Sequence, residues 1–178
     1  MDYYEMSIAG CKRKLPLCEV SPTLDIAAFI MFGDVEVTEA TASELLKKCP
    51  DHDIVLSAEA KGIPLCYEMA RQGCRKYVVA RKSVKLYMTD VIEFSCKSIT
   101  TAKEQTLYLS SEDAQALKDK RVLIVDDVIS TGDSLYALEE LVKKSGGKIV
   151  GKATVLAEGD AQKREDIIYL EPLPVFPK

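Results

Sequence analysis

The stretch Val122-Leu-Ile-Val-Asp-Asp-Val-Ile-Ser-Thr-Gly-Asp-Ser-Leu135 decides the fold of this chain. Its first four residues are apolar, which is typical of a strand buried on both faces of a parallel sheet. Beyond the polar segment, apolar residues recur at helical spacing from Leu135 to Val142, and Gly146-Gly147 ends the pattern. The stretch therefore predicts a strand, a tight loop and a helix in succession.

The loop of this unit has the composition of a phosphate cradle. Free backbone N–H groups gather where a loop enters a helix, and the helix dipole favours an anion there. Glycine allows close backbone approach, and hydroxyl groups can donate to the anion. The loop is not a P-loop, because the chain has no G-x-x-x-x-G-K-[ST] motif. We expect a phosphate to be bound by Ser130, Thr131, Gly132, Asp133 and Ser134.

Two neighbouring carboxylates, Asp126 and Asp127, lie between the strand and this loop. Ionised carboxylates accept hydrogen bonds from a sugar diol, and they can also orient waters on a magnesium ion. A diol beside a phosphate indicates a ribose 5-phosphate. The alternative is a strand–turn–helix in which the Asp, Ser and Thr side chains only cap the helix.

A second strand–loop–helix unit lies upstream. Residues 54–56 form a short apolar strand, residues 57–62 form a loop, and Pro64 is well placed for the first turn of a helix that ends at Gln72. The carboxyl ends of parallel strands line the ligand crevice of such a sheet. Its loop therefore belongs to the same candidate site.

A third apolar strand, Tyr77–Ala80, is followed by three cations that suit an anionic ligand such as pyrophosphate. These cations are Arg81, Lys82 and Lys85. An ordinary basic surface edge is the alternative. The repeated alternation of strands and helices favours a three-layer α/β domain with a mostly parallel central sheet.

Taken together, these motifs resemble type I phosphoribosyltransferases. Residues 122–134 are similar to the family's binding motif for 5-phosphoribosyl 1-pyrophosphate (PRPP), and residues 78–85, Val-Val-Ala-Arg-Lys-Ser-Val-Lys, are similar to a segment of the purine enzymes. The resemblance covers roughly residues 15–160. It implies the type I phosphoribosyltransferase fold, with Mg²⁺ accompanying PRPP, and we assign no protein side chain as a metal ligand.

The resemblance also implies roles for single residues. Asp126 and Asp127 would be the catalytic carboxylates. The base would be contacted by Val128 and Glu158. Pyrophosphate would be bound by Glu59, Ala60, Lys61, Gly62, Arg81, Lys82 and Lys85. For Glu59 and Lys61 a solvated charge pair is the alternative, because so short a motif is weakly specific.

The choice of base depends on Glu158. Xanthine and 6-oxopurine enzymes usually offer a lysine in this neighbourhood, whereas an ionised carboxylate accepts from the amino group and ring N–H of adenine. We therefore expect purine salvage in which adenine and PRPP give AMP and pyrophosphate. A xanthine or 6-oxopurine enzyme, a non-catalytic PRPP-binding regulator, and a Glu158 that faces solvent are the alternatives.

The resemblance implies a single domain, 1–178, with a hood from about 1–25 and 157–178 over the base. The alternative for residues 1–25 is an irregular, solvated arm. Residues 83–106 would form a mobile lid, although Thr100-Thr101 replaces the Glu-Tyr pair of the best-known adenine enzymes. We also expect a short helix or strand within 25–32. The capping-box spacing Thr41-Ala-Ser-Glu44 favours a helix from about Thr38 to Cys49.

Bulk composition narrows the class of protein. The 178 residues carry a net charge of -4 and are 47% hydrophobic, which favours one globular domain rather than a nucleic-acid-coating protein. The chain shows no membrane-length apolar run and no signal peptide, and its six cysteines form no C-x-x-C pair. We expect a cytoplasmic enzyme with reduced thiols, no nucleic-acid or membrane partner and, by family analogy, a homodimer.

Overall fold

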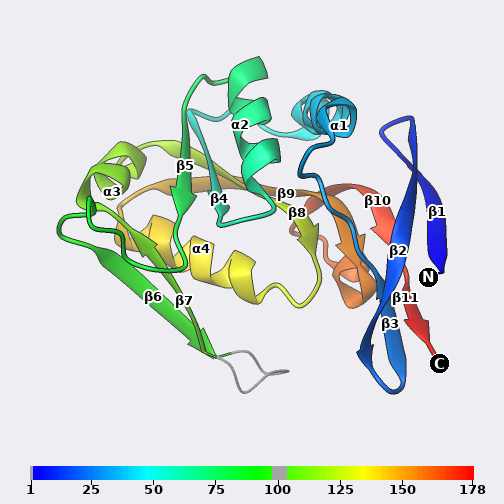
Figure 1. Ribbon diagram of the computed structural model, residues 1–178. Helices are drawn as coiled ribbons and strands as arrows, with labels where there is room; N and C mark the ends of the chain where they lie inside the picture. The colour runs from blue at the N-terminus through cyan, green and yellow to red at the C-terminus, as the bar shows by residue number, and fades with distance from the viewer. Residues whose placement is uncertain (1, 98–103) are drawn as a thin grey trace.

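The structure, a computed structural model, describes residues 2–97 and 104–178 (Figure 1). At its centre is a five-stranded sheet in which every neighbouring pair of strands is parallel. In spatial order the strands are β10 (Ile168–Leu173), β9 (Lys148–Glu158), β8 (Arg121–Ile129), β4 (Ile54–Ala58) and β5 (Tyr77–Ala80). The predicted α/β fold with a mostly parallel sheet is confirmed.

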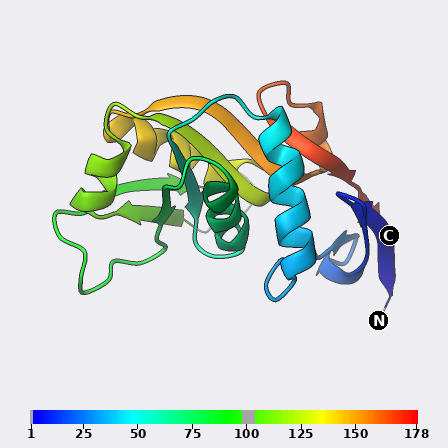
Figure 2. The same cartoon turned by 90° about the horizontal axis from the view of Figure 1, so that it is seen from above.

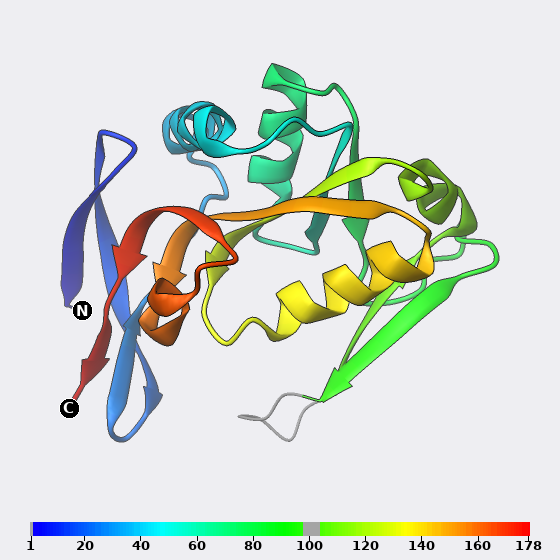
Figure 3. The same cartoon turned by 180° about the vertical axis from the view of Figure 1, so that it is seen from behind.

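Helices cover both faces of this sheet. On one face lie α1 (Val35–Lys48) and α2 (Ile63–Gln72), and on the other lies α4 (Asp133–Lys144), as Figures 1 and 3 show. Strand β8 explains the layering, because its successive side chains point to opposite faces. Leu123 and Val125 pack into the cluster that includes α1 and α2, whereas Val122 and Ile124 pack into the cluster that includes α4. All four side chains are fully buried.

A second sheet is built from both ends of the chain, and we call it the terminal sheet. Its order is β1 (Tyr3–Ile8), β2 (Cys11–Ser21), β3 (Leu24–Ala27) and β11 (Val175–Pro177). Figure 2 shows the two termini beside each other at this sheet. The alternative of an irregular, solvated arm at 1–25 was therefore wrong.

The error at the N-terminus has a physical cause. Strands β1 and β2 are joined by a two-residue turn in which Ala9 and Gly10 have φ of +49° and +83°. Such turns are usually recognised in a sequence by Asn-Gly or Asp-Gly, and alanine rarely adopts a positive φ. Buried Ile8 and Leu15 then attach the hairpin to the core.

Helix α1 begins earlier than its capping-box spacing predicted. Its N-cap is Asp34, whose Oδ1 accepts from the backbone N–H of Val37 at 3.2 Å. Thr41 lies inside the helix, where its Oγ1 donates to the carbonyl of Val37 at 2.7 Å, so the capping-box interpretation was wrong. A threonine in a helix interior can satisfy its hydroxyl this way, which makes the spacing ambiguous.

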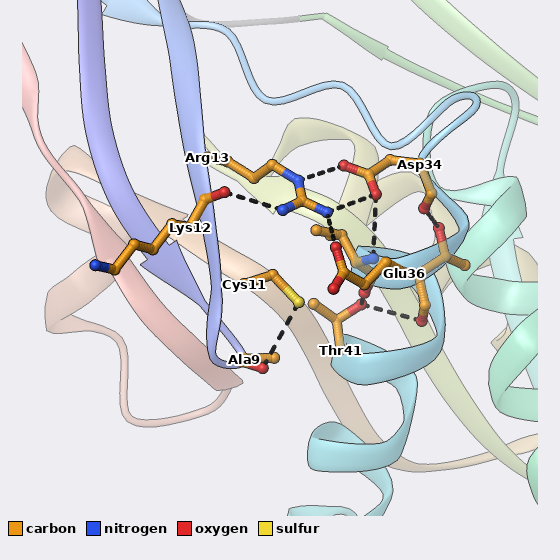
Figure 4. A network of polar contacts seen from close by, with 9 residues as sticks. Ala9, Cys11, Lys12, Arg13, Asp34, Glu36 and Thr41 are labelled. Atoms are coloured by element: carbon orange, nitrogen blue, oxygen red, sulfur yellow. Dashed lines mark hydrogen bonds and ion pairs between the residues drawn. The ribbon is translucent and has the colours of Figure 1, made fainter.

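The same N-cap connects α1 to the terminal sheet. Arg13 on β2 donates from Nε to Asp34 Oδ2 at 2.7 Å and from Nη2 to Asp34 Oδ1 at 2.9 Å. Its Nη2 also donates to Glu36 Oε2 at 2.7 Å, and Nη1 donates to the carbonyl of Lys12 at 2.9 Å (Figure 4). This fork with Arg13 lowers the pKa of Asp34. One guanidinium thus ties the terminal sheet to the main domain.

The remaining segments follow the predicted order, with shifted bounds. Within 83–106, strands β6 (Ile92–Lys97) and β7 (Glu104–Leu109) pair antiparallel and pack against α4, where the rings of Phe94 and Tyr136 lie 5.6 Å apart. Thr100-Thr101 lies outside the described residues. Within 25–32 only the end of β3 is regular. The short elements are α3 (Ser111–Leu117) and η1 (Gly159–Lys163). No helix in the described part is long and apolar enough to cross a membrane.

Candidate active site

The candidate site lies where the carboxyl ends of β4, β5, β8 and β9 meet. Because all these strands are parallel, the loops that follow them converge on one edge of the sheet. These loops carry most of the residues that the sequence singled out. Three groups meet there: a carboxylate pair, a group of cations and a loop at a helix N-terminus.

The carboxylate pair lies inside β8, near its carboxyl end, in a largely buried setting. Asp127 is only 3% exposed, and its backbone N–H donates to Asp126 Oδ1 at 2.9 Å. Burial, followed by the neighbouring charge of Asp127, raises the pKa of Asp126 to about 8. Buried carboxylates of this kind favour a cationic or hydroxyl-rich ligand, which can replace the solvation they have lost.

Lys61 supplies a positive charge to this pair. Its Nζ lies 3.1 Å from Asp127 Oδ2, in an ion pair without hydrogen-bond geometry, and half of the lysine side chain is exposed. Lys61 therefore neutralises the buried carboxylate from a half-exposed position at the edge of the site. A lysine in that position can bind the leaving group of a substrate held by the carboxylates.

Close packing places Lys61 there. Gly62 lies against β8, so a methyl carbon at that position would be 2.9 Å from Asp126 Oδ1 and 2.3 Å from Ser57 Oγ. Ala60 belongs to the same tight turn, in which the carbonyl of Ala60 accepts from the N–H of Ile63 at 3.1 Å, and the Glu59–Ala60 peptide bond is cis. Any side chain at 62 would push loop 59–62 away from the carboxylates.

Glu59 orients the cations that follow β5. Its Oε2 accepts from the backbone N–H of Lys82 at 2.9 Å, and its Oε1 accepts from Arg81 Nη2 at 3.2 Å. These two donors, the Lys82 amide first, lower the pKa of Glu59. Arg81 Nη1 also donates to Tyr87 Oη at 2.5 Å, and Lys85 Nζ donates to Ser83 Oγ at 2.6 Å. Glu59 thus fixes the orientation of the Arg81 guanidinium at the carboxyl end of β5.

Loop 130–134 closes around a cavity of about 140 Å³, which we call the small cavity. Gly132 is the N-cap of α4 with φ of +85° and provides no side-chain cap, so the first amides of the helix lack an intrahelical partner at this loop. Thr131 Oγ1 donates to Asp133 Oδ2 at 3.0 Å, and Ser134 Oγ donates to Gln105 Oε1 on β7 at 3.4 Å. The predicted site residues that line this cavity are Asp126, Val128, Ser130, Thr131, Gly132, Asp133 and Ser134.

A larger cavity of about 560 Å³ lies on the other side of Ser130 and Thr131, and we call it the large cavity. Glu158 lines it and is 8% exposed, so this carboxylate is largely buried at the cavity wall. Sequence reasoning missed Arg164 and Val175, which line the same wall. Both reach the site through tertiary contacts that no local pattern reports.

Among the side chains that the structure describes, which exclude those of residues 96–104, no three from His, Cys, Asp or Glu lie close enough to hold a metal ion. The donor chemistry nevertheless suits Mg²⁺ that arrives with a phosphate ligand, because this ion typically takes one or two protein carboxylates together with substrate oxygens. Asp127 Oδ2 is buried with no hydrogen-bond partner in the described part of the chain, so it has acceptor capacity to spare. Asp126 and Asp127 would hold the ion there.

Comparison with known proteins identifies the class to which this fold and site belong. The family model for the phosphoribosyl transferase domain matches residues 34–174. The chain belongs to this family.

Named relatives make the similarity more specific. An adenine phosphoribosyltransferase of Thermotoga petrophila is 36% identical over 123 residues, covering 68% of this chain and 64% of that protein. One of Rubrobacter xylanophilus is 30% identical over 165 residues, covering 86% and 74%. A hypoxanthine/guanine phosphoribosyltransferase of Methanotorris igneus is 33% identical over 117 residues, covering 62% and 57%. The match thus spans slightly less than two thirds of the Thermotoga petrophila relative.

Solved structures show the same fold. The adenine phosphoribosyltransferase of Thermoanaerobacter pseudethanolicus has a TM-score of 0.67 at 22% identity, covering 96% of this chain and 95% of that one. The Giardia lamblia enzyme, solved in complex with 9-deazaadenine, has a TM-score of 0.69 at 22% identity, covering 89% and 93%. At such low identity these structures support the fold.

Proposed function

We propose that this protein transfers the 5-phosphoribosyl group of PRPP to adenine, giving AMP and pyrophosphate. One observation carries the proposal: loop 130–134 at the N-terminus of α4, a buried carboxylate pair and Lys61 meet at a single edge of the sheet. The loop suits the 5-phosphate of PRPP, the carboxylates suit the ribose diol, and the lysine suits the pyrophosphate. The adenine phosphoribosyltransferase relatives support the same reaction.

Each part of PRPP has its own binding group in this proposal. Loop 130–134 holds the 5-phosphate with backbone amides and hydroxyls. Asp126 and Asp127 accept from the ribose hydroxyls. Pyrophosphate lies against Lys61, the amides of loop 59–62 and the cations after β5, Arg81, Lys82 and Lys85.

In the reaction the C1′–O bond to pyrophosphate breaks, and the electron pair leaves with the pyrophosphate oxygen. A ring nitrogen of the base then forms the new bond to C1′ and loses its proton to solvent. Positive charge that develops on the sugar is stabilised by the carboxylate pair, and negative charge on the leaving group is stabilised by Lys61 and Arg81. Mg²⁺, when bound, supplies further positive charge to the pyrophosphate oxygens.

Adenine is the base that Glu158 favours. Its carboxylate lines the large cavity next to the loop that would hold the 5-phosphate, and it accepts from an amino group or a ring N–H. Val128 lies on the side of the small cavity, between the carboxylates and this loop. The terminal sheet reaches the large cavity through Val175 of β11, so we propose that it acts as the hood over the base.

The setting of the enzyme is part of the same proposal. The five described cysteines, Cys11, Cys18, Cys49, Cys66 and Cys74, are free thiols, which suits a reducing compartment. We propose a cytoplasmic homodimer that uses PRPP with Mg²⁺, as the family resemblance implies.

The test is a steady-state assay with PRPP and Mg²⁺ against adenine, hypoxanthine, guanine, xanthine and orotate in parallel. We expect AMP formation with adenine and at least a hundredfold lower kcat/KM with the oxopurines, because a site built around an acceptor leaves an oxo group unpaired. Preference for hypoxanthine or guanine would keep the reaction but contradict the role of Glu158. PRPP binding without turnover of any base would indicate a regulator instead.

A further inference from the structure

Arg164 lies beside loop 130–134, although it comes from a distant part of the chain. It follows η1, lines the large cavity, and its Nη1 would be 2.4 Å from a methyl carbon placed on Gly132. Since glycine has no side chain, the guanidinium can lie directly against the backbone of the loop at its left-handed residue. No group assigned to substrate binding so far includes this arginine.

The guanidinium is held in one orientation. Arg164 donates from Nε and Nη2 to the two carboxylate oxygens of Asp166, at 2.9 and 2.8 Å. Asp166 is itself held by Lys152, whose Nζ lies 2.5 Å from Asp166 Oδ2 and 3.0 Å from Glu139 Oε1. This bidentate pairing uses one edge of the guanidinium, and Nη1, which donates to no other described residue, faces Gly132.

The charged side chains that line the two cavities are mainly acidic, so a cation in this orientation would favour the binding of an anion. In the described part of the chain, the residues that line them include three carboxylates, Asp133, Glu158 and Asp160, besides Asp126, and Arg164 is the only cation. A phosphate dianion beside Asp133 would be repelled by this field unless a positive charge lay close to the loop. Arg164 is the residue that supplies it.

We propose that Arg164 is a positioning residue for the 5-phosphate. It braces loop 130–134 at Gly132 and offsets the negative charge of Asp133, so that the loop can accept a phosphate dianion. The inference rests on the proposed function and adds to it a residue that acts on affinity for the phosphorylated sugar. It predicts an effect on PRPP and ribose 5-phosphate, with little effect on adenine.

The experiment compares Arg164→Ala with Lys163→Ala by calorimetric binding of ribose 5-phosphate and by steady-state kinetics. Lys163 is the matched control, because it is the neighbouring cation and its side chain is 81% exposed and paired only with exposed Asp160. We expect Arg164→Ala to weaken ribose 5-phosphate binding and raise KM for PRPP roughly 10- to 100-fold, with kcat and KM for adenine changed less than about threefold. Lys163→Ala should stay within about twofold of wild type.

Two further variants separate positioning from folding. Arg164→Lys keeps the charge without the planar fork, and we expect an intermediate loss. Asp166→Asn releases the guanidinium, and we expect a smaller rise in KM for PRPP than in Arg164→Ala. Millimolar guanidinium should partly restore ribose 5-phosphate binding to Arg164→Ala. The inference would be overturned if folded Arg164→Ala bound ribose 5-phosphate as tightly as wild type. If the alanine variant does not fold, the same comparison is made with Arg164→Lys. Failure of the wild type itself to bind ribose 5-phosphate would contradict the proposed function.

Discussion

Lys61 and Asp127 form an ion pair with Nζ and Oδ2 3.1 Å apart, which joins the loop after β4 to the buried end of β8. The two residues differ in exposure, since half of the lysine side chain faces solvent and only 4% of the aspartate side chain does. The pair therefore spans the border between the buried carboxylates and the open edge of the sheet. In the proposed complex the ribose of PRPP lies on the carboxylate side of this pair, and the pyrophosphate lies on the lysine side.

Replacing Lys61 by alanine should raise KM for PRPP and lower kcat, each by roughly 10- to 100-fold, because a charged contact to the leaving group is lost and Asp127 is left without its neighbour. Steady-state kinetics with varied PRPP measures both constants. Lys76→Ala is the control, since Lys76 is exposed and lies just before β5, at the opposite end of the sheet. If the two variants had the same kcat and the same KM for PRPP, Lys61 would have no role in binding pyrophosphate.

The raised pKa of Asp126 predicts how stability depends on pH. The folded state keeps this proton up to about pH 8, whereas the unfolded chain releases it near the ordinary value of 3.8. Between these values the folded state binds more protons, so stability falls as pH rises. Asp126→Asn removes the effect, and its Tm relative to wild type should increase by a few degrees from pH 5 to pH 8.

Asp53→Asn is the control for this measurement. Hydrogen bonds from Arg121 lower the pKa of Asp53 to about 2, so this carboxylate titrates below the tested range. The difference in Tm between Asp53→Asn and wild type should therefore stay constant from pH 5 to pH 8. A difference for Asp126→Asn that is equally constant would mean that Asp126 titrates normally.

Gly132→Ala should abolish measurable binding of ribose 5-phosphate. The residue has φ of +85°, and its new methyl group would lie 2.4 Å from Arg164 Nη1, so the substitution strains the loop and displaces the arginine together. Gly10→Ala is a matched control, because Gly10 has φ of +83° and nothing lies within 4 Å of its added carbon. Both variants should lose about 1–2 kcal/mol of stability to the left-handed backbone. Only Gly132→Ala should lose the ligand, and retained binding would exclude loop 130–134 as the phosphate site.

The fork between Arg13 and Asp34 predicts a role for the terminal sheet. Removing it by Arg13→Ala should lower Tm by a few degrees and raise KM for adenine several-fold, with KM for PRPP nearly unchanged, because the proposed hood loses its tie to α1. Lys14→Ala is the control, because it removes the neighbouring cation on β2 and breaks only its exposed pair with Glu5 on β1. A rise in KM for PRPP of equal size would argue against a hood that covers the base alone.

The parallel sheet and the loop at its edge could be predicted because local patterns specify them. An uninterrupted apolar strand, the two carboxylates and Gly132 lie within one short stretch, and Pro64 and Gly73 mark the ends of α2. The resemblance to phosphoribosyltransferases then predicted PRPP as the ligand. Comparison with known proteins confirms the family and the fold, and the roles of single site residues stay predictions.

Other features depend on tertiary contacts and carried no local signal. The hairpin of β1 and β2 turns at Ala9, a residue that does not indicate a positive φ. Asp34 caps α1 while paired with Arg13, which is distant in sequence. Arg164 reaches Gly132 only because β9 brings η1 beside the end of β8. Sequence periodicity does not report contacts of this kind.

The most direct test of the central claim is to quantify AMP and pyrophosphate from adenine, PRPP and Mg²⁺, using wild type and the Asp126→Asn/Asp127→Asn double variant. The account predicts equal amounts of the two products from wild type. It predicts at least a hundredfold slower turnover by a folded double variant, because the charge that stabilises the cationic sugar is gone. Turnover by the double variant at the wild-type rate, or no AMP from wild type, would contradict it.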